Sequence, residues 1–279
     1  FNGLRELRLK QGENKWDQIV QTELLSHPVK EVVHLDPITQ RSFLKPRGYP
    51  GDAVLLDMIY DHPSVCLDKF SETGKKICEF TSGDHAASAV RYRRQYIGRY
   101  IDYLAEKIDK PKILSVACGH LREAEISDAV QKGAVGKFIA LDQDEKSLAV
   151  VHSDYGHHGV TARLGSVRGI VKKEFQATGF DFIYSAGLYD YLNQKVAKTL
   201  TRRLFDMLAR GGRLLFTNFL PAIQAVGYME SYMDWQLIFR DEIEMMDIAR
   251  AIPRNQVERI EMFVEKQENI VFLQIQKSK

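Results

Sequence analysis

The sequence has little cysteine, no strong charge of either sign and no long apolar run, and each absence excludes a class of protein. Its three cysteines are widely separated, which fits neither a disulfide framework nor the spacing of a zinc site. The 39 Lys and Arg nearly balance 37 Asp and Glu, so the formal charge of +2 gives no bulk attraction to nucleic acid. No apolar run approaches the roughly 20 residues that span a bilayer, and no secretory pattern opens the chain. We expect a cytoplasmic globular protein without membrane, nucleic-acid or metal partners.

Short β-rich runs alternate with helical patterns from about residue 112 onward, which predicts a parallel sheet with crossover helices. The expected strands are 112–117, 137–142, 160–165, 180–186 and 212–219, and the expected helices are 121–132, 144–153, 168–175 and 194–209, the last ended by "ARGG". After a helical pattern at 230–250, two β runs joined by "KQEN" predict a terminal hairpin. The predicted fold is α/β, a Rossmann-like seven-stranded sheet with a terminal antiparallel hairpin, plus an N-terminal helical cap.

The first part of the chain, residues 1–110, has a different pattern. Amphipathic helices are expected at about 13–26, 51–61, 63–80 and 84–108, with a strand-like signal only in "EVVHL". Lysines and a helix-stopping proline in "DKPK" mark the boundary. We predict that this part is a helical cap, a lid and substrate-binding region packed on the domain of residues 111–279.

A glycine-poor loop, "LSVACGHLREAE", joins the first expected strand to a helix. A dinucleotide-binding loop needs glycine at three places, whereas this loop has only Gly119, and Arg122 occupies the third place. A ligand without phosphate relaxes the requirement, and S-adenosylmethionine (SAM) is such a ligand. Its ribose hydroxyls require a carboxylate at the end of the next strand, where Asp142 lies 23 residues after Gly119. The alternative is a plain strand-to-helix turn with Asp142 as a helix N-cap.

Longer motifs resemble a known family. "LSVACGHLRE", "FIALDQ", "FDFIYSAGLYDYL" and "ARGGRLLFTNF" look like class I SAM-dependent methyltransferases over residues 112–279. "KPRGYPGDAVLLDMIY", "AVRYRRQYI", "SAGLYDYL" and "YMESYMDWQLIFRDEIEM" are similar to bacterial methyltransferases linked to methyl esters of 3-hydroxy fatty acids, the extracellular-factor type of secondary metabolism.

The resemblance implies that SAM is the cofactor and that the loops after the strands hold it. It implies Ala117, Cys118 and Gly119 at the methionine end, Asp142 and Gln143 at the ribose, and Gly165, Ser166 and Val167 beside the adenine. Two positions depart from the usual pattern. No Asp is present to accept from the adenine amino group, and Ser115 replaces the usual acid of the first strand.

The segment after the fourth strand lies where open α/β sheets bind ligands, at the carboxyl edge. It contains Ser185, Ala186, Gly187, Tyr189 and Asp190, which we expect to form the floor of the reaction site. Tyr189 either faces the sulfonium or packs against a helix, and the sequence leaves both open. Further along the chain, Asn218 ends the fifth strand at the same edge, and Trp235 and Arg240 suit a substrate wall.

Two N-terminal motifs also have two interpretations. "RGYPGD" is either a tight corner with Asp52 as N-cap or, from the resemblance, a lid segment with Tyr49 and Asp52 as cofactor contacts. "RYRRQY" is by default a solvated basic face, but Arg91 and Arg94 share one face of a helix. They are suited to grip a carboxylate of the cofactor or the substrate.

These observations predict a SAM-dependent methyltransferase acting on a small molecule or acyl acceptor, through a carboxylate or hydroxyl. One alternative is another use of SAM, such as intramolecular cyclisation to azetidine-2-carboxylate with release of methylthioadenosine. A second alternative is a non-catalytic SAM-binding module. The sequence leaves the acceptor and the oligomeric state open.

Overall fold

The computed structural model describes all residues, Phe1–Lys279. The chain forms two compact units, one of Phe1–Arg91 and Ala222–Leu237, the other of Tyr92–Pro221 and Ile238–Lys279. No helix is long and apolar enough to cross a membrane.

The division between the units differs from the boundary predicted near residue 110. Helix α7 (His85–Lys107) runs across the division without a break. Its C-terminal part belongs with the sheet because aromatic side chains join the two; the ring of Tyr96 lies 5.3 Å from that of Phe272. Residues 222–237 belong to the first unit because Gly227 packs against the backbone of Leu4. The role of residues 1–110 as a cap stays a prediction.

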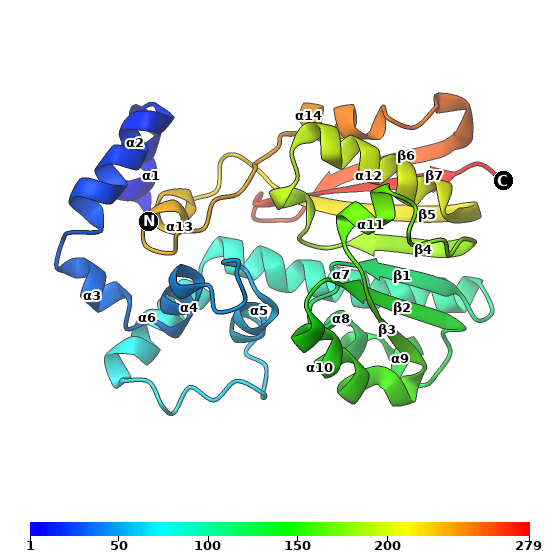
Figure 1. Cartoon of the computed structure of the whole chain (residues 1–279), viewed down its shortest axis with the longest axis horizontal. Coiled ribbons are helices and arrows are strands. Elements are labelled where there is room, and N and C mark those ends of the chain that lie inside the picture. Colours follow the sequence, from blue (N-terminus) through cyan, green and yellow to red (C-terminus); the bar gives the residue numbers. More distant parts are fainter. The chain divides into compact units, whose positions relative to one another are not determined.

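The second unit contains a seven-stranded sheet of order β3-β2-β1-β4-β5-β7-β6 (Figure 1). The parallel strands are β1 (Lys112–Val116), β2 (Lys137–Asp142), β3 (Val160–Leu164), β4 (Phe180–Ser185) and β5 (Leu208–Phe219). The antiparallel strands are β6 (Val257–Val264) and β7 (Ile270–Lys277). The predicted α/β sheet with a terminal hairpin is confirmed.

The strand register shows which strand ends lie together at the carboxyl edge of this sheet. Val116 of β1 pairs with Leu141 of β2, and Ser115 pairs with Tyr184 of β4. The carboxyl ends of these three strands therefore lie side by side. The chain proceeds from β1 to β2 and β3 on one side and to β4 and β5 on the other. The gap between β1 and β4 is the topological switch point, where open α/β sheets bind ligands.

Helices cover both faces of the sheet, and strand side chains alternate between them. On one face, Ile183 of β4 belongs to a core with Leu200 and Leu204 of α12 (Gln194–Asp206), seen in front of the sheet in Figure 1. On the other face, Phe182 contacts Tyr100 of α7, with ring centroids 4.9 Å apart. The remaining helices of this unit are α8 (Glu123–Ile126), α9 (Asp128–Gln131), α10 (Glu145–Tyr155), α11 (Val167–Val171) and α14 (Glu242–Ala249), with 3-10 turns at Gly156–His158, Tyr189–Tyr191 and Arg254–Gln256.

Several predicted helices have different limits in the structure. The helix expected at 121–132 is two short helices, because Ser127 has extended backbone and its side chain caps α9. "ARGG" is not a helix stop, since β5 already begins at Leu208. In place of one helix at 230–250 there are α13 (Val226–Ser231) and α14, the latter started by a capping box at Asp241.

The first unit is helical. It contains α1 (Asn2–Lys10), α2 (Glu13–Ile19), a π-helical turn (Val20–Leu24), α3 (Val29–Val33), α4 (Pro37–Leu44), α5 (Ala53–Ile59), α6 (Glu72–Ser82), the start of α7, and α13. The predicted strand signal in "EVVHL" is wrong, because its first three residues belong to α3 and His34 and Leu35 form a turn. The predicted helix at 63–80 begins only after Ser71, whose side chain caps α6. Arg8 joins the start of the chain to α13 through Glu230, with Nε to Oε2 at 2.7 Å.

Gly98 of α7 is required for close helix packing. A Cβ atom at this position would lie 2.9 Å from Cβ of Ile126 and 3.0 Å from the carbonyl oxygen of Glu123. We expect Gly98→Ala to lower the free energy of unfolding by about 1–3 kcal/mol, because overpacking outweighs the gain of up to about 1 kcal/mol in helix propensity. Chemical denaturation measures this.

Gly3→Ala is the matched control, since Gly3 lies in α1 with no atom within 4 Å of the added Cβ. The control is expected to be neutral or stabilising. Equal stabilisation of both variants would contradict the packing role of Gly98.

Candidate functional site

The loop after β1 has an unusual backbone. Ala117, Gly119 and Leu121 have φ values of 56°, 54° and 54°. Left-handed backbone is unfavourable for residues with a Cβ atom, so two of these three positions are strained. Cys118 holds the loop against β2 by donating its N–H to the carbonyl of Leu141 at 3.1 Å. Strained loops of this kind are concentrated at functional sites.

Asp142 at the end of β2 fixes this loop. Its Oδ2 accepts from the N–H of Gly119 at 2.8 Å, and its Oδ1 accepts from the N–H of Asp144 at 2.9 Å. Burial raises the pKa of Asp142, and the backbone N–H groups oppose this. The N-cap of α10 is Asp144, so the alternative prediction that Asp142 is the helix N-cap is wrong. Each carboxylate oxygen can accept a further hydrogen bond, such as one from a ligand hydroxyl.

The ends of β3 and β4 contribute the other predicted cofactor residues of this unit. Gly165 donates to the carbonyl of Asp142 at 2.9 Å, and the hydroxyl of Ser166 caps α11 by accepting from Gly169 at 3.1 Å. Ser185 donates to the carbonyl of Val116 at 3.0 Å, which joins β4 to β1. The predicted cofactor residues of this unit therefore lie along one edge of the sheet, at the carboxyl ends of β3, β2, β1 and β4: Ala117, Cys118, Gly119, Asp142, Gln143, Gly165, Ser166, Val167, Ser185, Ala186 and Gly187.

Tyr189 packs in the core. The residue is fully buried, its hydroxyl hydrogen-bonds to that of Thr201 on α12 at 2.8 Å, and its ring stacks on Phe216 with centroids 4.2 Å apart. Of the two interpretations that the sequence left open, helix packing is the one that this geometry supports.

Asn218 and Arg240 belong to a buried structural network instead of presenting free groups to a substrate. The Nη1 of Arg240 donates to Oδ1 of Asn218 and to the carbonyl of Tyr189, each at 2.7 Å. Its Nη2 donates to the carbonyl of Leu192, and its Nε donates to Gln194 at 3.0 Å. With 1% exposure and four hydrogen bonds, Arg240 has a structural role, and its role in substrate binding stays a prediction.

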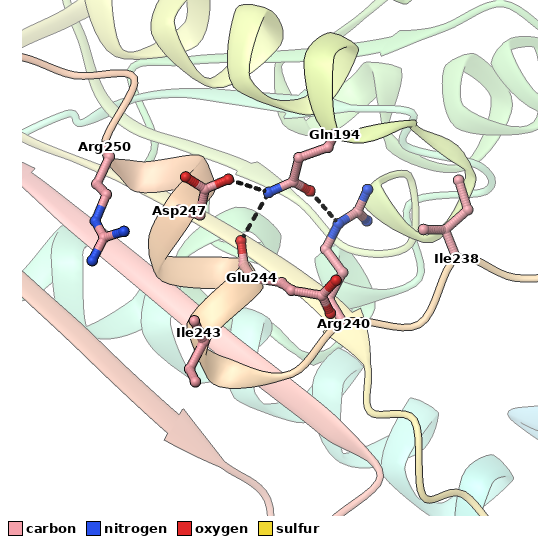
Figure 2. A pocket seen from close by; sticks show the side chains of 7 residues that line it. All are labelled: Gln194, Ile238, Arg240, Ile243, Glu244, Asp247 and Arg250. Carbon is pink, nitrogen blue, oxygen red and sulfur yellow. Dashed lines mark hydrogen bonds between the residues drawn. The ribbon is translucent and has the colours of Figure 1, made fainter.

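A surface pocket of about 390 Å³ lies beside this network (Figure 2). It is lined by Gln194, Ile238, Arg240, Ile243, Glu244, Asp247 and Arg250. Gln194 donates to Asp247 at 2.9 Å and to the carbonyl of Glu244 at 3.1 Å, as Figure 2 shows. These polar groups bind one another, and the pocket lies on the α14 side, apart from the loops after β1 and β2.

Asp190 is a buried acid in the segment after β4. Its Oδ1 accepts from the N–H of Phe219 at 2.7 Å. Burial raises the pKa of Asp190 to about 6, against the opposing charges of Arg93 and Arg240. This carboxyl group therefore fastens β5 to the segment after β4.

Three further buried residues near the first loop, Glu123, Tyr184 and Arg93, were not predicted as site residues. Glu123 accepts from the hydroxyl of Tyr184 at 2.6 Å, and burial raises the pKa of both groups. Burial also raises the pKa of the Cys118 thiol, so it stays neutral. The third group is Arg93, which is 4% exposed. Its position could have been found from helical spacing, because Arg93, Ile97 and Ile101 share one buried face of α7.

Arg94, the predicted substrate-binding residue of this helix, is half-buried and lies next to the buried face. Its charge acts on Glu123, whose pKa it lowers together with Arg93.

The predicted residues of the first unit have local structural roles. Asp52 is the N-cap of α5, accepting from Leu55 at 2.9 Å, and forms two hydrogen bonds of 2.8 Å with Arg41. Arg91 donates to the carbonyls of Ile59 and Ser82 at 2.9 and 2.8 Å. Tyr49 is half-buried, and Trp235 is buried with its backbone N–H donating to the carbonyl of Met229. Their cofactor and catalytic roles stay predictions.

Nothing in the structure provides a cluster for a metal, since no group of three or more His, Cys, Asp or Glu is placed to hold one.

Comparison with solved structures shows which fold this is. A possible exported protein from Bordetella parapertussis is similar over 82% of this chain and 80% of its own, with a TM-score of 0.65 and 15% identity. Magnesium protoporphyrin IX methyltransferase from Synechocystis PCC 6803, with bound SAH, is similar over 70% of this chain and 88% of its own, with a TM-score of 0.50 and 12% identity. No family model matches the sequence, and no curated protein matches it. The chain has the α/β Rossmann-like fold of class I SAM-dependent methyltransferases.

The raised pKa of Asp190 predicts a pH dependence of stability. Its folded pKa of about 6 lies above the ordinary value of 3.8, so the folded state binds the extra proton between these values. We expect the free energy of unfolding to fall by about 2–3 kcal/mol as pH rises from 4 to 7, as far as this group contributes. Asp190→Asn retains an acceptor for Phe219 and removes this contribution.

Urea denaturation of wild type and Asp190→Asn at several pH values measures the difference in slope. Identical slopes in the two proteins would show that Asp190 is ionised throughout this range.

Proposed function

We propose that this protein is a SAM-dependent methyltransferase that modifies a small molecule or acyl group at a carboxylate or hydroxyl. The observation that carries the proposal is the hydrogen bond from Gly119 to Asp142, which holds a buried carboxylate beside the strained loop after β1.

The geometry after β1 disfavours a pyrophosphate ligand. Phosphate groups bind at the N-terminus of a regular helix, where several backbone N–H groups point at the anion. Here α8 has only four residues. Arg122, just before it, is buried and pairs with Asp154 at 2.8 Å, so its charge has a partner within the protein. A ligand that presents an amino-acid portion to this loop does not need the N-terminus of a longer helix.

The residues at the switch point fit SAM. Asp142 would accept hydrogen bonds from the ribose hydroxyls, and Ala117, Cys118 and Gly119 would line the methionine portion. When bound, SAM supplies a methyl group activated by its positive sulfonium. The protein then has to align the acceptor with that methyl group and exclude water. Cys118, as a neutral buried thiol, adds no competing negative charge there.

The acceptor is proposed from the narrower sequence resemblance, which indicates a 3-hydroxy fatty acid or an acyl group on a carrier. The magnesium protoporphyrin IX methyltransferase shares the fold and has SAH bound, and we extend its use of this cofactor to the present chain. The predicted cytoplasmic location belongs to the same proposal.

Product analysis tests the reaction. Incubation with SAM and a 3-hydroxy fatty acid is expected to yield S-adenosylhomocysteine only when the acid is added. Formation of methylthioadenosine without any acceptor would contradict methyl transfer and support intramolecular cyclisation. Binding without turnover across a panel of acids and alcohols would indicate a binding module. Mass spectrometry distinguishes these products.

Asp142→Ala tests the ribose assignment. We expect the affinity for S-adenosylhomocysteine to fall by about 1–3 kcal/mol, because the ribose hydroxyls lose their acceptor. Isothermal titration calorimetry measures this, and circular dichroism confirms folding. The control is Asp144→Asn, which keeps the N-cap of α10. Unchanged affinity in folded Asp142→Ala would refute the ribose contact.

A further inference from the structure

Arg93 is a buried cation with unused donors. It is 4% exposed, and its Nε and Nη1 have no hydrogen-bond partner. A guanidinium keeps its charge, and burying its N–H groups without acceptors is unfavourable. Arg240 in the same unit is equally buried but donates four hydrogen bonds. The contrast shows that this fold can satisfy a buried guanidinium fully, and that it does not do so at Arg93.

The guanidinium of Arg93 lies at the switch point. A Cβ atom added to Gly187 would be 3.4 Å from Nη2 and 3.6 Å from Nη1. The guanidinium therefore rests against the backbone just after β4. Because residue 187 is glycine, no side chain at this position covers the guanidinium.

Two buried acids compensate the charge of Arg93 without binding its donors. Glu123 and Asp190 both interact with it electrostatically. Glu123 accepts instead from Tyr184 at 2.6 Å, and Asp190 accepts from the N–H of Phe219 at 2.7 Å. Because these two acids already place negative charge near Arg93, a ligand with a single negative charge suits this place better than a phosphate dianion.

We propose that Arg93 binds a carboxylate of the ligand at the switch point, an inference that rests on the proposed function. A planar carboxylate matches the donor geometry of a guanidinium and accepts from two of its N–H groups. That carboxylate belongs either to the methionine portion of the cofactor or to a carboxylic acid acceptor, and the two sources are separated by experiment.

The first measurement uses S-adenosylhomocysteine and its decarboxylated counterpart, titrated calorimetrically into the full chain. Wild type is expected to prefer the carboxylated form by about 10- to 100-fold. Arg93→Met is expected to lose this preference. Arg93→Lys, which keeps a cation beside Glu123 and Asp190, is expected to fold and to lose most of it. Arg99→Lys is the control, since Arg99 is exposed on the same helix.

The second measurement tests whether the carboxylate that Arg93 binds belongs to the acceptor. Thermal shifts with 3-hydroxydecanoic acid and its primary amide, both in the presence of S-adenosylhomocysteine, report the preference for the acid. Loss of that preference in the Arg93 variants, with the cofactor preference intact, supports the acceptor as the source.

Folded Arg93 variants that keep wild-type preferences in both measurements would overturn the inference. Wild-type protein that binds no S-adenosylhomocysteine would instead overturn the proposed function. Wild-type protein that binds it, but prefers a carboxylate in neither measurement, would overturn the inference alone.

Discussion

The hydrogen bond from Gly119 to Asp142 is the interaction on which the candidate site depends. It ties the loop after β1 to the end of β2, and two positions of that loop other than glycine are left-handed. Such a backbone persists only where its surroundings hold it. The same carboxylate also binds the N–H of Asp144, so one buried acid fixes both the loop and the start of the segment leading to α10.

The second constraint is that charged side chains buried along the sheet edge need hydrogen-bond partners. Arg240 fastens α12, β5 and the segment after β4, because its Nε, Nη1 and Nη2 each donate to a protein acceptor. Asp190 fastens β5 to the same segment. These residues stabilise the edge and leave few groups for a ligand. Arg93, whose donors are open, is therefore the group at this edge that the protein alone does not explain.

Much of the fold followed from local pattern. The β-rich runs predicted all seven strands, and β2 matches its expected limits at 137–142. Helix limits were less accurate where a polar residue interrupts the pattern, as Ser127 does between α8 and α9. Glycines also misled, because Gly211 and Gly212 lie inside β5 and not after a helix. A strand neighbour can override a local stop signal. Here β5 pairs with β4 on both sides of the two glycines, at Leu208 and Arg213, and the register shifts between these pairs.

Local pattern was enough to predict the sheet, its terminal hairpin and the place of Asp142 at the end of β2, because hydrophobic periodicity and strand ends are local properties. Which polar side chains are already hydrogen-bonded within the protein depends on long-range contacts. Tyr189, Asn218 and Arg240 bind partners 12 to 51 positions away along the chain, and local pattern does not contain such partners. The tertiary structure also places the guanidinium of Arg93 against Gly187 with its Nε and Nη1 buried without acceptors, which the letters of "RYRRQY" do not show.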